Sequence, residues 1–308
     1  MILITEFMND KAVDTLRSKY EVIYDKSLAD NQEKIPDMMK DIKAIIVRNR
    51  TQVNENLLTH SPNLSCVGRL GVGLDNIDLE SCKKRNLAVY PATGANTNGV
   101  VEYVLTSALV LLRGAFYKTE EMVSGAWPRE QSSGNEITGK VLGLVGFGEI
   151  AQKTADLAKN FNMQIMAFDP FLDKNSSAWN NVKNVNLEEL LRSSDVISVH
   201  TPLNKSTHHL INSTNLNFMK KTAVIINAAR GGVIDDKALS EKLRKNEIKG
   251  AALDVYETEP MDINSGSYFH NLKNVILTPH IAGVTEESNV NVSAMIANKI
   301  DKHLSGLI

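Results

Sequence analysis

Residues 143–152 read GLVGFGEIAQ, a short apolar run followed by Gly-x-Gly-x-x-Ala and the first residues of a helical pattern. A glycine pattern is weak by itself, because glycine-rich corners join strands and helices in many folds. Here it lies between the strand-like VLGLV and the helix-like IAQKTADLAKNF, the context that a dinucleotide-binding turn requires. Gly146 permits a tight turn, and Gly148 lets the backbone approach a pyrophosphate at the helix N-terminus.

An acidic residue lies at a suitable distance beyond this turn. The next strand-like run ends at Asp169, twenty-one residues after Gly148, and Pro170 keeps Asp169 out of helical conformation. A carboxylate there can accept hydrogen bonds from a ribose diol and would repel a 2′-phosphate, so the pattern favours NAD over NADP. The candidate coenzyme contacts at this turn are Gly146, Gly148, Glu149, Ile150 and Asp169.

Short β-branched or apolar runs alternate with amphipathic helical stretches, which predicts parallel sheets with helices on both faces. The first lobe has five such runs: ILIT, EVIYD, KAIIVRN, LSCVGRL and LAVYP. The second lobe has six: VLGLVGFG, QIMAFDP, VISVHTP, TAVIINAAR, GAALDVY and NVILTPH, which predict a six-stranded doubly wound sheet. Residues 96–125 are predicted to form one long helical segment that leads into the second lobe.

The last amphipathic stretch, residues 285–304, decides the domain organisation. If this helix packs on the first lobe, the second lobe is an insertion. We therefore expect an α/β fold of two Rossmann-like or flavodoxin-like lobes, with the nucleotide lobe inserted into the substrate lobe. The predicted domains are a substrate-binding (catalytic) domain, residues 1–96 plus 284–308, and an NAD-binding Rossmann domain, residues 97–283.

The charge and composition of the sequence limit the classes of partner and the location that we expect. The 308 residues carry a formal net charge of −2 and no long run of one sign, which argues against nucleic-acid or membrane-surface binding. The amino terminus lacks the basic and apolar regions of a signal peptide, and the longest apolar run is too short to span a membrane. Cys66, Cys82 and the pair His208–His209 lack metal-ligand spacing, so no metal is expected. We expect a cytoplasmic protein.

Three strand ends of the second lobe carry residues suited to redox chemistry. INAARGG contains Arg230, LDVYETEP contains Asp254 and Glu259, and LTPHIAG contains His280. A single arginine or histidine is more often structural than functional. Ligands of open α/β sheets bind at the carboxyl ends of strands, so the joint placement of these residues predicts an active site.

The same stretches, with VRNRTQV, GRLGVGLDNID, LVGFGEIA, HTPLNKSTHHLI and INAARGGVIDDKAL in chain order, resemble the D-isomer-specific 2-hydroxyacid dehydrogenase family over essentially the whole chain. The chain looks most like the catalytic portion of 3-phosphoglycerate dehydrogenases, and the sulfolactate dehydrogenase branch is also close. The resemblance implies NAD-dependent hydride transfer with a small 2-hydroxy or 2-oxo acid that carries an anionic tail, as in 3-phosphoglycerate. Sulfolactate dehydrogenase and hydroxypyruvate or glyoxylate reductase are the alternatives.

The resemblance also implies roles for individual residues. His280 would take the proton of the C2 hydroxyl, Glu259 would hydrogen-bond the other ring nitrogen, and Arg230 would bind the substrate carboxylate. The further coenzyme contacts that it implies are Thr201, Pro202, Ala228, Ala229, Asp254 and Gly283.

In the first lobe, the resemblance implies that backbone amides bind the substrate carboxylate, so that closure of the lobes completes the site. These amides belong to Leu70, Gly71, Val72 and Gly73. Arg48 is the best candidate for a charged substrate tail, and Arg50 and Arg69 are weaker ones. Trp127 and Arg129 lie in a region that forms the dimer interface in this family, so a homodimer is expected.

A second class of function shares the architecture. NAD(H)-sensing co-regulators bind partners and turn over little substrate, and they carry docking clefts and extra segments that are not visible in this sequence. Formate dehydrogenases of related fold have Gln where Glu259 stands, which argues against formate chemistry.

Overall fold

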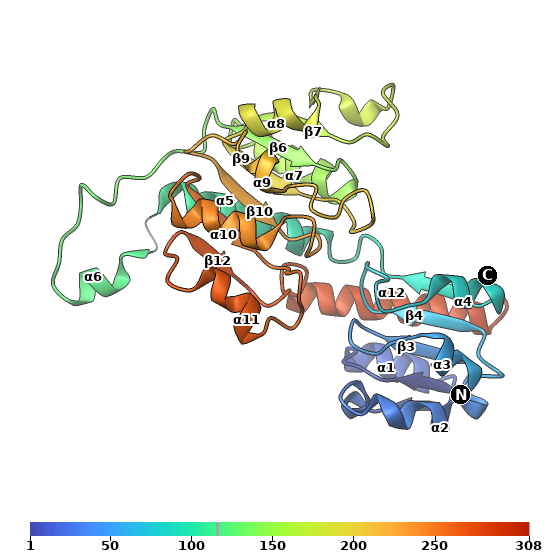
Figure 1. Ribbon diagram of the computed structural model, residues 1–308. Helices are drawn as coiled ribbons and strands as arrows, with labels where there is room; N and C mark the ends of the chain where they lie inside the picture. Colours follow the sequence, from blue (N-terminus) through green and yellow to red (C-terminus); the bar gives the residue numbers. More distant parts are fainter. Residues whose placement is uncertain (115–116, 308) are drawn as a thin grey trace. The chain divides into compact units, whose positions relative to one another are not determined.

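The computed structural model describes residues 1–114 and 117–307, and the chain divides into two compact units. Unit 1 comprises Met1–Asn96 with Val284–Ile308, and unit 2 comprises Thr97–Gly283. Each unit contains a parallel sheet with helices on both faces, which confirms the predicted fold class (Figure 1). No helix of the described residues is long and apolar enough to span a membrane.

The sheet of unit 1 has five parallel strands in the order β2-β1-β3-β4-β5. They correspond to the five runs predicted from the sequence. Their bounds are β1 (Ile2–Ile4), β2 (Val22–Tyr24), β3 (Ala44–Val47), β4 (Cys66–Arg69) and β5 (Ala88–Pro91).

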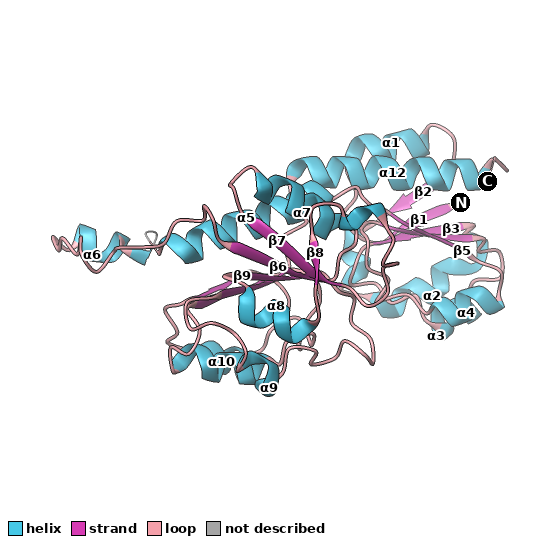
Figure 2. Cartoon of the chain, turned by 90° about the horizontal axis from the view of Figure 1, so that it is seen from above, coloured by secondary structure: helices cyan, strands magenta, loops and turns pink. Residues whose placement is uncertain are grey.

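Two layers of helices enclose this sheet (Figure 2). One face is covered by α1 (Asp10–Arg17) and α12 (Glu286–Leu304), and the other by α2 (Ile35–Met38), α3 (Glu55–Thr59) and α4 (Leu79–Lys84). Short 3-10 turns are η1 (Lys26–Ala29), η2 (Gln32–Lys34) and η3 (Met39–Asp41). A Cβ on Gly68 of β4 would lie 2.7 Å from Cγ2 of Ile296, so the glycine lets α12 approach the sheet closely. The last helix of the chain is therefore part of the unit 1 core.

The sheet of unit 2 has seven parallel strands in the order β12-β11-β10-β9-β6-β7-β8. Their bounds are β6 (Val141–Val145), β7 (Gln164–Phe168), β8 (Lys183–Asn184), β9 (Val196–Val199), β10 (Val224–Asn227), β11 (Gly250–Leu253) and β12 (Val275–Leu277). The prediction of six strands was wrong by one edge strand. Both residues of β8 are polar and exposed, so β8 has no apolar pattern to detect.

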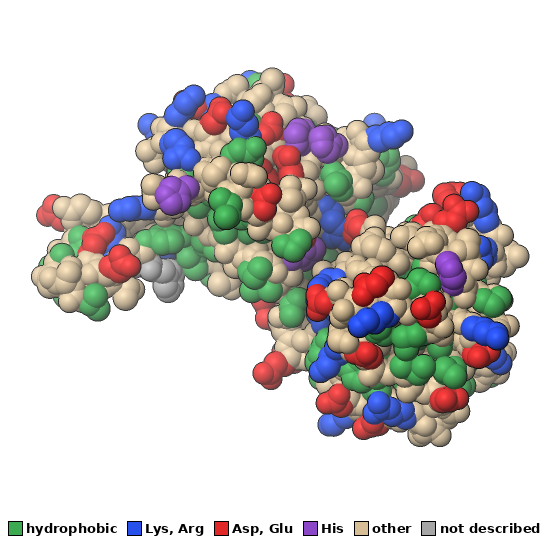
Figure 3. Space-filling model, turned by 60° about the horizontal axis from the view of Figure 1, so that its bottom comes forward, with side chains coloured by type: hydrophobic (Ala, Val, Ile, Leu, Met, Phe, Trp, Pro, Cys, Tyr) green, Lys and Arg blue, Asp and Glu red, His purple; other side chains and the backbone are tan. Residues whose placement is uncertain are grey.

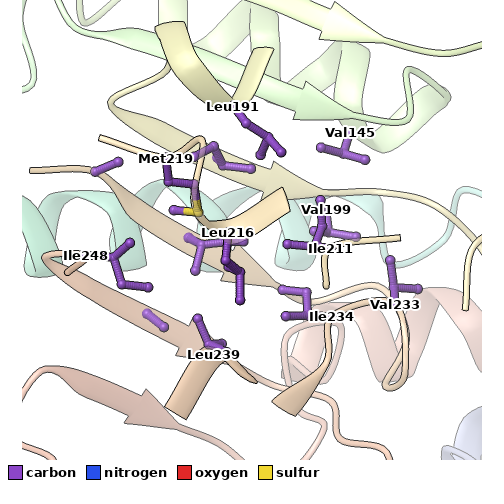
Figure 4. Close-up of a cluster of buried hydrophobic side chains, with 14 of the residues drawn as sticks. Val145, Leu191, Val199, Ile211, Leu216, Met219, Val233, Ile234, Leu239 and Ile248 are labelled. Atoms are coloured by element: carbon purple, nitrogen blue, oxygen red, sulfur yellow. The ribbon is translucent and has the colours of Figure 1, made fainter. Parts of the chain in front are cut away.

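Helices cover both faces of this sheet as well (Figure 2). The first face carries α5 (Thr97–Arg113) and α7 (Glu149–Lys159); the second carries α8 (Leu187–Ser193), α9 (Ser213–Leu216) and α10 (Asp236–Arg244). The remaining short elements are α11 (Ile263–Gly266), η5 (Ser177–Trp179) and η6 (Ser267–Phe269). Figure 4 shows the second-face core, in which Leu191, Leu216 and Leu239 pack on the strands.

The long helical segment predicted for residues 96–125 is interrupted. Helix α5 ends at Arg113, Gly114 has a φ of +62°, and a separate helix α6 spans Thr119–Val123. Glycine commonly ends helices in this way because it enters the left-handed region without a Cβ penalty. Residues 115 and 116, which the prediction included, lie outside the described residues. The segment around α6 stands away from the rest of unit 2 (Figure 1).

Candidate active site

The glycine turn after β6 has the geometry that close backbone approach requires. Gly146 has a φ of +90°, and a Cβ there would lie 2.7 Å from the carbonyl oxygen of His200. Gly148 is the residue before the first turn of α7, and a Cβ on it would meet only open space. The space beside Gly148 at the start of α7 is therefore open, and amides of a helix N-terminus can bind an anion there.

Asp169 ties this turn to the end of β7. Its Oδ2 accepts a hydrogen bond from the Phe147 amide at 2.9 Å, and its Oδ1 accepts from the amides of Phe171 and Leu172 at 2.9 and 3.1 Å. Each carboxylate oxygen can accept more than one hydrogen bond, so Asp169 keeps capacity for ribose hydroxyls. The sequence predicted where Asp169 lies but not that its carboxylate shapes the glycine turn.

A buried hydroxyl beside the turn lacks a partner. Thr201 Oγ1 is buried and, within residues 1–114 and 117–307, no hydrogen-bond partner reaches it. Such a group costs roughly 1–3 kcal/mol when left unsatisfied. Thr201 also lies against the turn, with Cγ2 at 2.9 Å from an ideal Cβ on Gly146. The orphaned hydroxyl, the glycine cradle and the open helix end together fit a bound dinucleotide.

His200, which the sequence analysis did not single out, lies beneath this cradle. Burial lowers the pKa of His200 to about 4, and its Nε2 lies 2.9 Å from Ser198 Oγ. His200 is therefore neutral at neutral pH and brings no charge to the glycine turn.

The other predicted coenzyme residues follow the ends of β6, β9, β10 and β12. Glu149 Oε1 accepts a hydrogen bond from the Thr97 hydroxyl at 3.2 Å, and the Pro202 carbonyl accepts from Thr207 Oγ1 at 2.6 Å. Ile150, Ala228, Ala229 and Gly283 are each partly exposed.

A buried carboxylate at the end of β11 holds the turn that follows β12. Asp254 is 1% exposed, and its Oδ1 accepts hydrogen bonds from Thr278 Oγ1 at 2.6 Å and from the Ile281 amide at 2.8 Å. Its Oδ2 accepts from the Ala282 amide at 2.7 Å. Tyr103 of α5 extends this network, since its hydroxyl lies 2.7 Å from Thr278 Oγ1. Asp254 thus holds residues on both sides of His280, through the Thr278 side chain and the Ile281 and Ala282 amides.

His280 and Glu259 form a close pair. His280 Nδ1 lies 2.7 Å from Glu259 Oε2, and the second Glu259 oxygen accepts a hydrogen bond from the Tyr256 amide at 3.0 Å. Burial alone raises the pKa of Glu259. The hydrogen bonds from His280 and Tyr256 and the positive charge of Arg230 outweigh that effect and hold the Glu259 pKa below its usual value. An ionised Glu259 thus orients the ring through Nδ1, and Nε2 is the nitrogen available for proton transfer.

The backbone of His280 is unusual for a residue with a side chain. Its φ is +55°, in the left-handed region that favours glycine. His280 lies three residues beyond the end of β12, as predicted from Pro279, and its side chain is 43% exposed. Backbone strain at a half-exposed histidine is typical of functional sites, where surrounding contacts hold it in place.

Arg230 lies in the loop after β10, the strand that pairs with β11. The Asn227 side chain shapes this loop, donating to the Arg230 carbonyl at 2.9 Å and accepting from the Ala229 amide at 3.1 Å. Arg230 Nη1 donates to the Ala229 carbonyl at 2.5 Å. The structure thus brings Arg230, Glu259 and His280 to the carboxyl ends of β10, β11 and β12.

In unit 1, Glu6 organises the loop that carries Arg48. Glu6 is 4% exposed and accepts hydrogen bonds from the amides of Arg48, Arg50 and Thr51 at 2.8 to 3.2 Å. The Arg48 side chain donates to Asn289 Oδ1 at 3.0 Å and lies 5.9 Å from the centroid of the Phe7 ring. Burial lowers the pKa of Arg48, and the charge of Glu6 opposes that shift. Sequence analysis missed Glu6, although an acidic residue directly after a buried strand is a usable signal.

The two weaker arginine candidates have partners inside unit 1. Arg50 forms an ion pair with Asp30. Arg69 folds over its own turn and donates to the Leu70 carbonyl at 2.9 Å. These contacts favour structural roles for both.

Two of the four predicted substrate-binding amides are engaged within unit 1. The Leu70 amide donates to the Val47 carbonyl, and the Gly71 amide donates to the Arg69 carbonyl, each at 2.8 Å. Among the described residues, the amides of Val72 and Gly73 have no such acceptor.

A sequence profile of the D-isomer specific 2-hydroxyacid dehydrogenase family, NAD binding domain, matches residues 105–282, more than half of the chain. A (S)-sulfolactate dehydrogenase of Chromohalobacter salexigens is 44% identical over 98% of each chain. This chain belongs to the D-isomer-specific 2-hydroxyacid dehydrogenase family. It is an NAD-dependent oxidoreductase that acts on the CH–OH group of 2-hydroxy acids.

Two further relatives support the same conclusion. A D-3-phosphoglycerate dehydrogenase of Archaeoglobus fulgidus is 35% identical over 99% of this chain, which spans 58% of that relative's length. The crystal structure of D-lactate dehydrogenase from Aquifex aeolicus, complexed with NAD and lactic acid, superimposes with a TM-score of 0.86 at 26% identity. The superposition covers 99% of this chain and 96% of the D-lactate dehydrogenase chain. NAD is therefore the cofactor of this family member.

Two alanine substitutions in the glycine turn should have different effects on stability and on NADH binding. Gly146→Ala should lower stability by roughly 1–3 kcal/mol and abolish tight NADH binding, because the new Cβ meets the His200 carbonyl and φ is positive. Gly148→Ala should keep the melting temperature and weaken NADH binding alone, since its Cβ points into the volume that the coenzyme would fill. Thermal unfolding and NADH fluorescence titration measure the two effects. Equal melting temperatures for both variants would contradict this account.

Proposed function

We propose that the protein interconverts a three-carbon 2-hydroxy acid that carries an anionic group at C3 and the corresponding 2-oxo acid, with a sulfonate tail as in sulfolactate as the first candidate. The pair formed by His280 Nδ1 and Glu259 Oε2, 2.7 Å apart at the strand ends, carries the chemical part of this proposal. The choice of tail rests on Arg48 and on the 44% identity with a (S)-sulfolactate dehydrogenase.

In the oxidation direction, His280 Nε2 takes the proton of the C2 hydroxyl as the hydrogen on C2 leaves as hydride and the carbonyl bond forms. Bound NAD supplies the acceptor for that hydride. Glu259 stabilises the imidazolium that results and keeps the ring in the required tautomer. Arg230 binds the substrate carboxylate through its planar guanidinium, which suits bidentate contact and holds C2 in position.

The coenzyme contacts are assigned as part of the same proposal. The amides of Gly148, Glu149 and Ile150 would hold the pyrophosphate, and Asp169 would accept hydrogen bonds from the adenosine ribose. Thr201, whose buried hydroxyl has no partner among the described residues, and Pro202 would border the adenosine half. Ala228, Ala229, Asp254 and Gly283 would hold the nicotinamide end.

The same proposal assigns substrate contacts to residues of unit 1. The turn Leu70–Gly73 contacts the substrate carboxylate, directly through the amides of Val72 and Gly73, and Arg48 binds the tail. A sulfonate carries one negative charge at all pH values near neutrality, which one guanidinium balances. A phosphate carries about −1.5 to −2 at pH 7 and calls for additional cations.

The second candidate is a 3-phosphoglycerate dehydrogenase, which the relative from Archaeoglobus fulgidus favours. A reductase of hydroxypyruvate or glyoxylate would not need the Arg48 contact. Steady-state kinetics with sulfolactate, 3-phosphoglycerate, hydroxypyruvate and glyoxylate side by side separate these activities. Failure to turn over any of them while NADH still binds would favour the NAD(H)-sensing binding protein instead.

His280→Ala should lower kcat by about 10²- to 10⁴-fold, the usual contribution of a general acid–base group, and leave NADH binding unchanged. The measurements are steady-state turnover and NADH fluorescence titration. A variant that retains near-normal turnover would show that another group transfers the proton.

Arg48→Ala should raise KM for a tailed substrate by at least about tenfold, because a charge-assisted contact of roughly 1.5–3 kcal/mol is lost. KM for glyoxylate, which has no tail, should change less than about twofold by the same argument. Arg50→Ala is the matched control, since Arg50 pairs with Asp30. Equal changes in KM for both kinds of substrate would mean that Arg48 does not contact the tail.

We also infer that the protein is a cytoplasmic homodimer that associates through the segment around α6. This segment carries Val123 and Trp127, which are 81% and 76% exposed, and the acidic residues Glu120 and Glu121 of α6. The projecting segment at the left of Figure 3 shows hydrophobic and acidic side chains on its surface. Large apolar side chains gathered on a projecting segment are typical of an interface. Sedimentation equilibrium should give a dimer mass, and Trp127→Ser should shift the equilibrium toward monomer. A monomeric wild-type protein at micromolar concentration would contradict this inference.

A further inference from the structure

The pair His208–His209 has no part in the function described so far, yet its geometry is constrained. The two rings stack, with centroids 4.0 Å apart and planes inclined by 19°. His209 has a φ of +48°, which is uncommon for a residue with a Cβ and carries a conformational penalty. Contacts of His209 must therefore outweigh that penalty.

The backbone of His209 is bonded to the loop that carries Arg230. Its amide donates to the Gly232 carbonyl at 2.7 Å. Two residues on, the Ile211 amide donates to the Val233 carbonyl at 3.1 Å. The segment 209–211 therefore runs beside the residues that directly follow Arg230.

The side chain of His209 is bonded to the loop that carries Glu259. Its Nε2 lies 2.9 Å from Glu257 Oε1, two residues before Glu259. Glu257 is held in turn by Asp236 at the start of α10. The Asp236 amide donates to Glu257 Oε1 at 3.2 Å, and the Glu257 amide donates to Asp236 Oδ2 at 3.1 Å. His209 thus contacts both loops at once.

The two loops also touch each other without side chains between them. A Cβ on Gly231 would lie 1.7 Å from the carbonyl oxygen of Tyr256, so only glycine fits there. Tyr256 in turn donates its amide to Glu259. A shift of one loop is therefore passed to the other through backbone contact, and it changes the distance from Arg230 to the Glu259–His280 pair.

We propose that His209 is a positioning residue for hydride transfer: its amide and its ring hold the Arg230 loop in register with the Glu259 loop. The inference rests on the proposed roles of Arg230, Glu259 and His280. Arg230 places the substrate carboxylate and His280 acts at the adjacent C2 hydroxyl, so their separation sets whether the reacting atoms align. A misplacement of about 1 Å in such a geometry can lower the rate by about 10²-fold.

The charges around His209 fit this role. Burial is the main cause that raises the pKa of Asp236 to about 6, and the neighbouring charges of Glu257 and Asp235 add to it. Two carboxylates, Asp236 and Glu257, thus lie close together beneath the loops. The ring of His209 donates into this acidic cluster and reduces the repulsion between them.

The test compares His209→Ala with His209→Gln, which keeps an N–H donor for Glu257. His209→Ala should lower kcat about tenfold, while KM and the dissociation constant of NADH change less than about twofold. His209→Gln should restore kcat to within about threefold of the wild type, by the same geometric argument. His60→Ala is the control, because the His60 ring is exposed and, among the described residues, forms hydrogen bonds only with its neighbours Asn56 and Thr59.

Three outcomes would overturn the inference: unchanged kcat in His209→Ala, equal losses in the Ala and Gln variants, or a loss confined to thermal stability. If His209→Ala does not fold, Glu257→Gln weakens the same contact from the other side and should lower kcat severalfold. His280→Ala, measured in parallel, keeps the two proposals distinct. If His280→Ala is inactive and His209→Ala is fully active, only the positioning role fails; if His280→Ala is active, the proposed function fails.

Discussion

The hydrogen bonds of the buried Asp254 carboxylate are the interaction on which the turn around His280 depends. Asp254 is 1% exposed, and hydrogen bonds must offset the free-energy cost of burying its carboxylate. Its partners are the Thr278 hydroxyl and the Ile281 and Ala282 amides. Hydrogen bonds to a charged group contribute roughly 1.5–3 kcal/mol each, which exceeds the strain of roughly 1–3 kcal/mol at a left-handed residue. The three bonds therefore explain how His280 keeps a φ of +55°. Tyr103 joins the same network from α5, so the turn around His280 is supported by a helix as well as by the sheet.

Much of the site follows from local patterns in the sequence. Apolar runs separated by helical stretches are enough to locate the strands, and residues that end successive parallel strands must lie at one edge of the sheet. That is why Arg230, Glu259 and His280 could be placed together without coordinates. The glycine turn was predictable for the same reason, because its strand and helix lie beside it in sequence.

What the sequence did not reveal depends on contacts between distant residues. The bonds from Asp254 to Ile281 and Ala282 involve residues 27 and 28 positions away, and no local pattern marks them. Strand β8 has two exposed polar residues and exists only because it pairs with β7. The end of α5 at Gly114 depends on one positive φ inside a stretch whose composition favours a continuous helix.

Because unit 1 is formed by two segments that are far apart in the sequence, its folding during translation differs from that of unit 2. Its core includes Ile296 and Ile300 of α12, which pack against Gly68 of β4, and these residues are translated only after all of unit 2. Unit 2 is continuous in sequence, so it can fold on the ribosome as soon as residue 283 has emerged. The first ninety-six residues, although made first, must wait until α12 is made, with the part of the sheet face that α12 covers still exposed. During that interval β1 to β5 are the part of the nascent chain most exposed to aggregation and to chaperone binding.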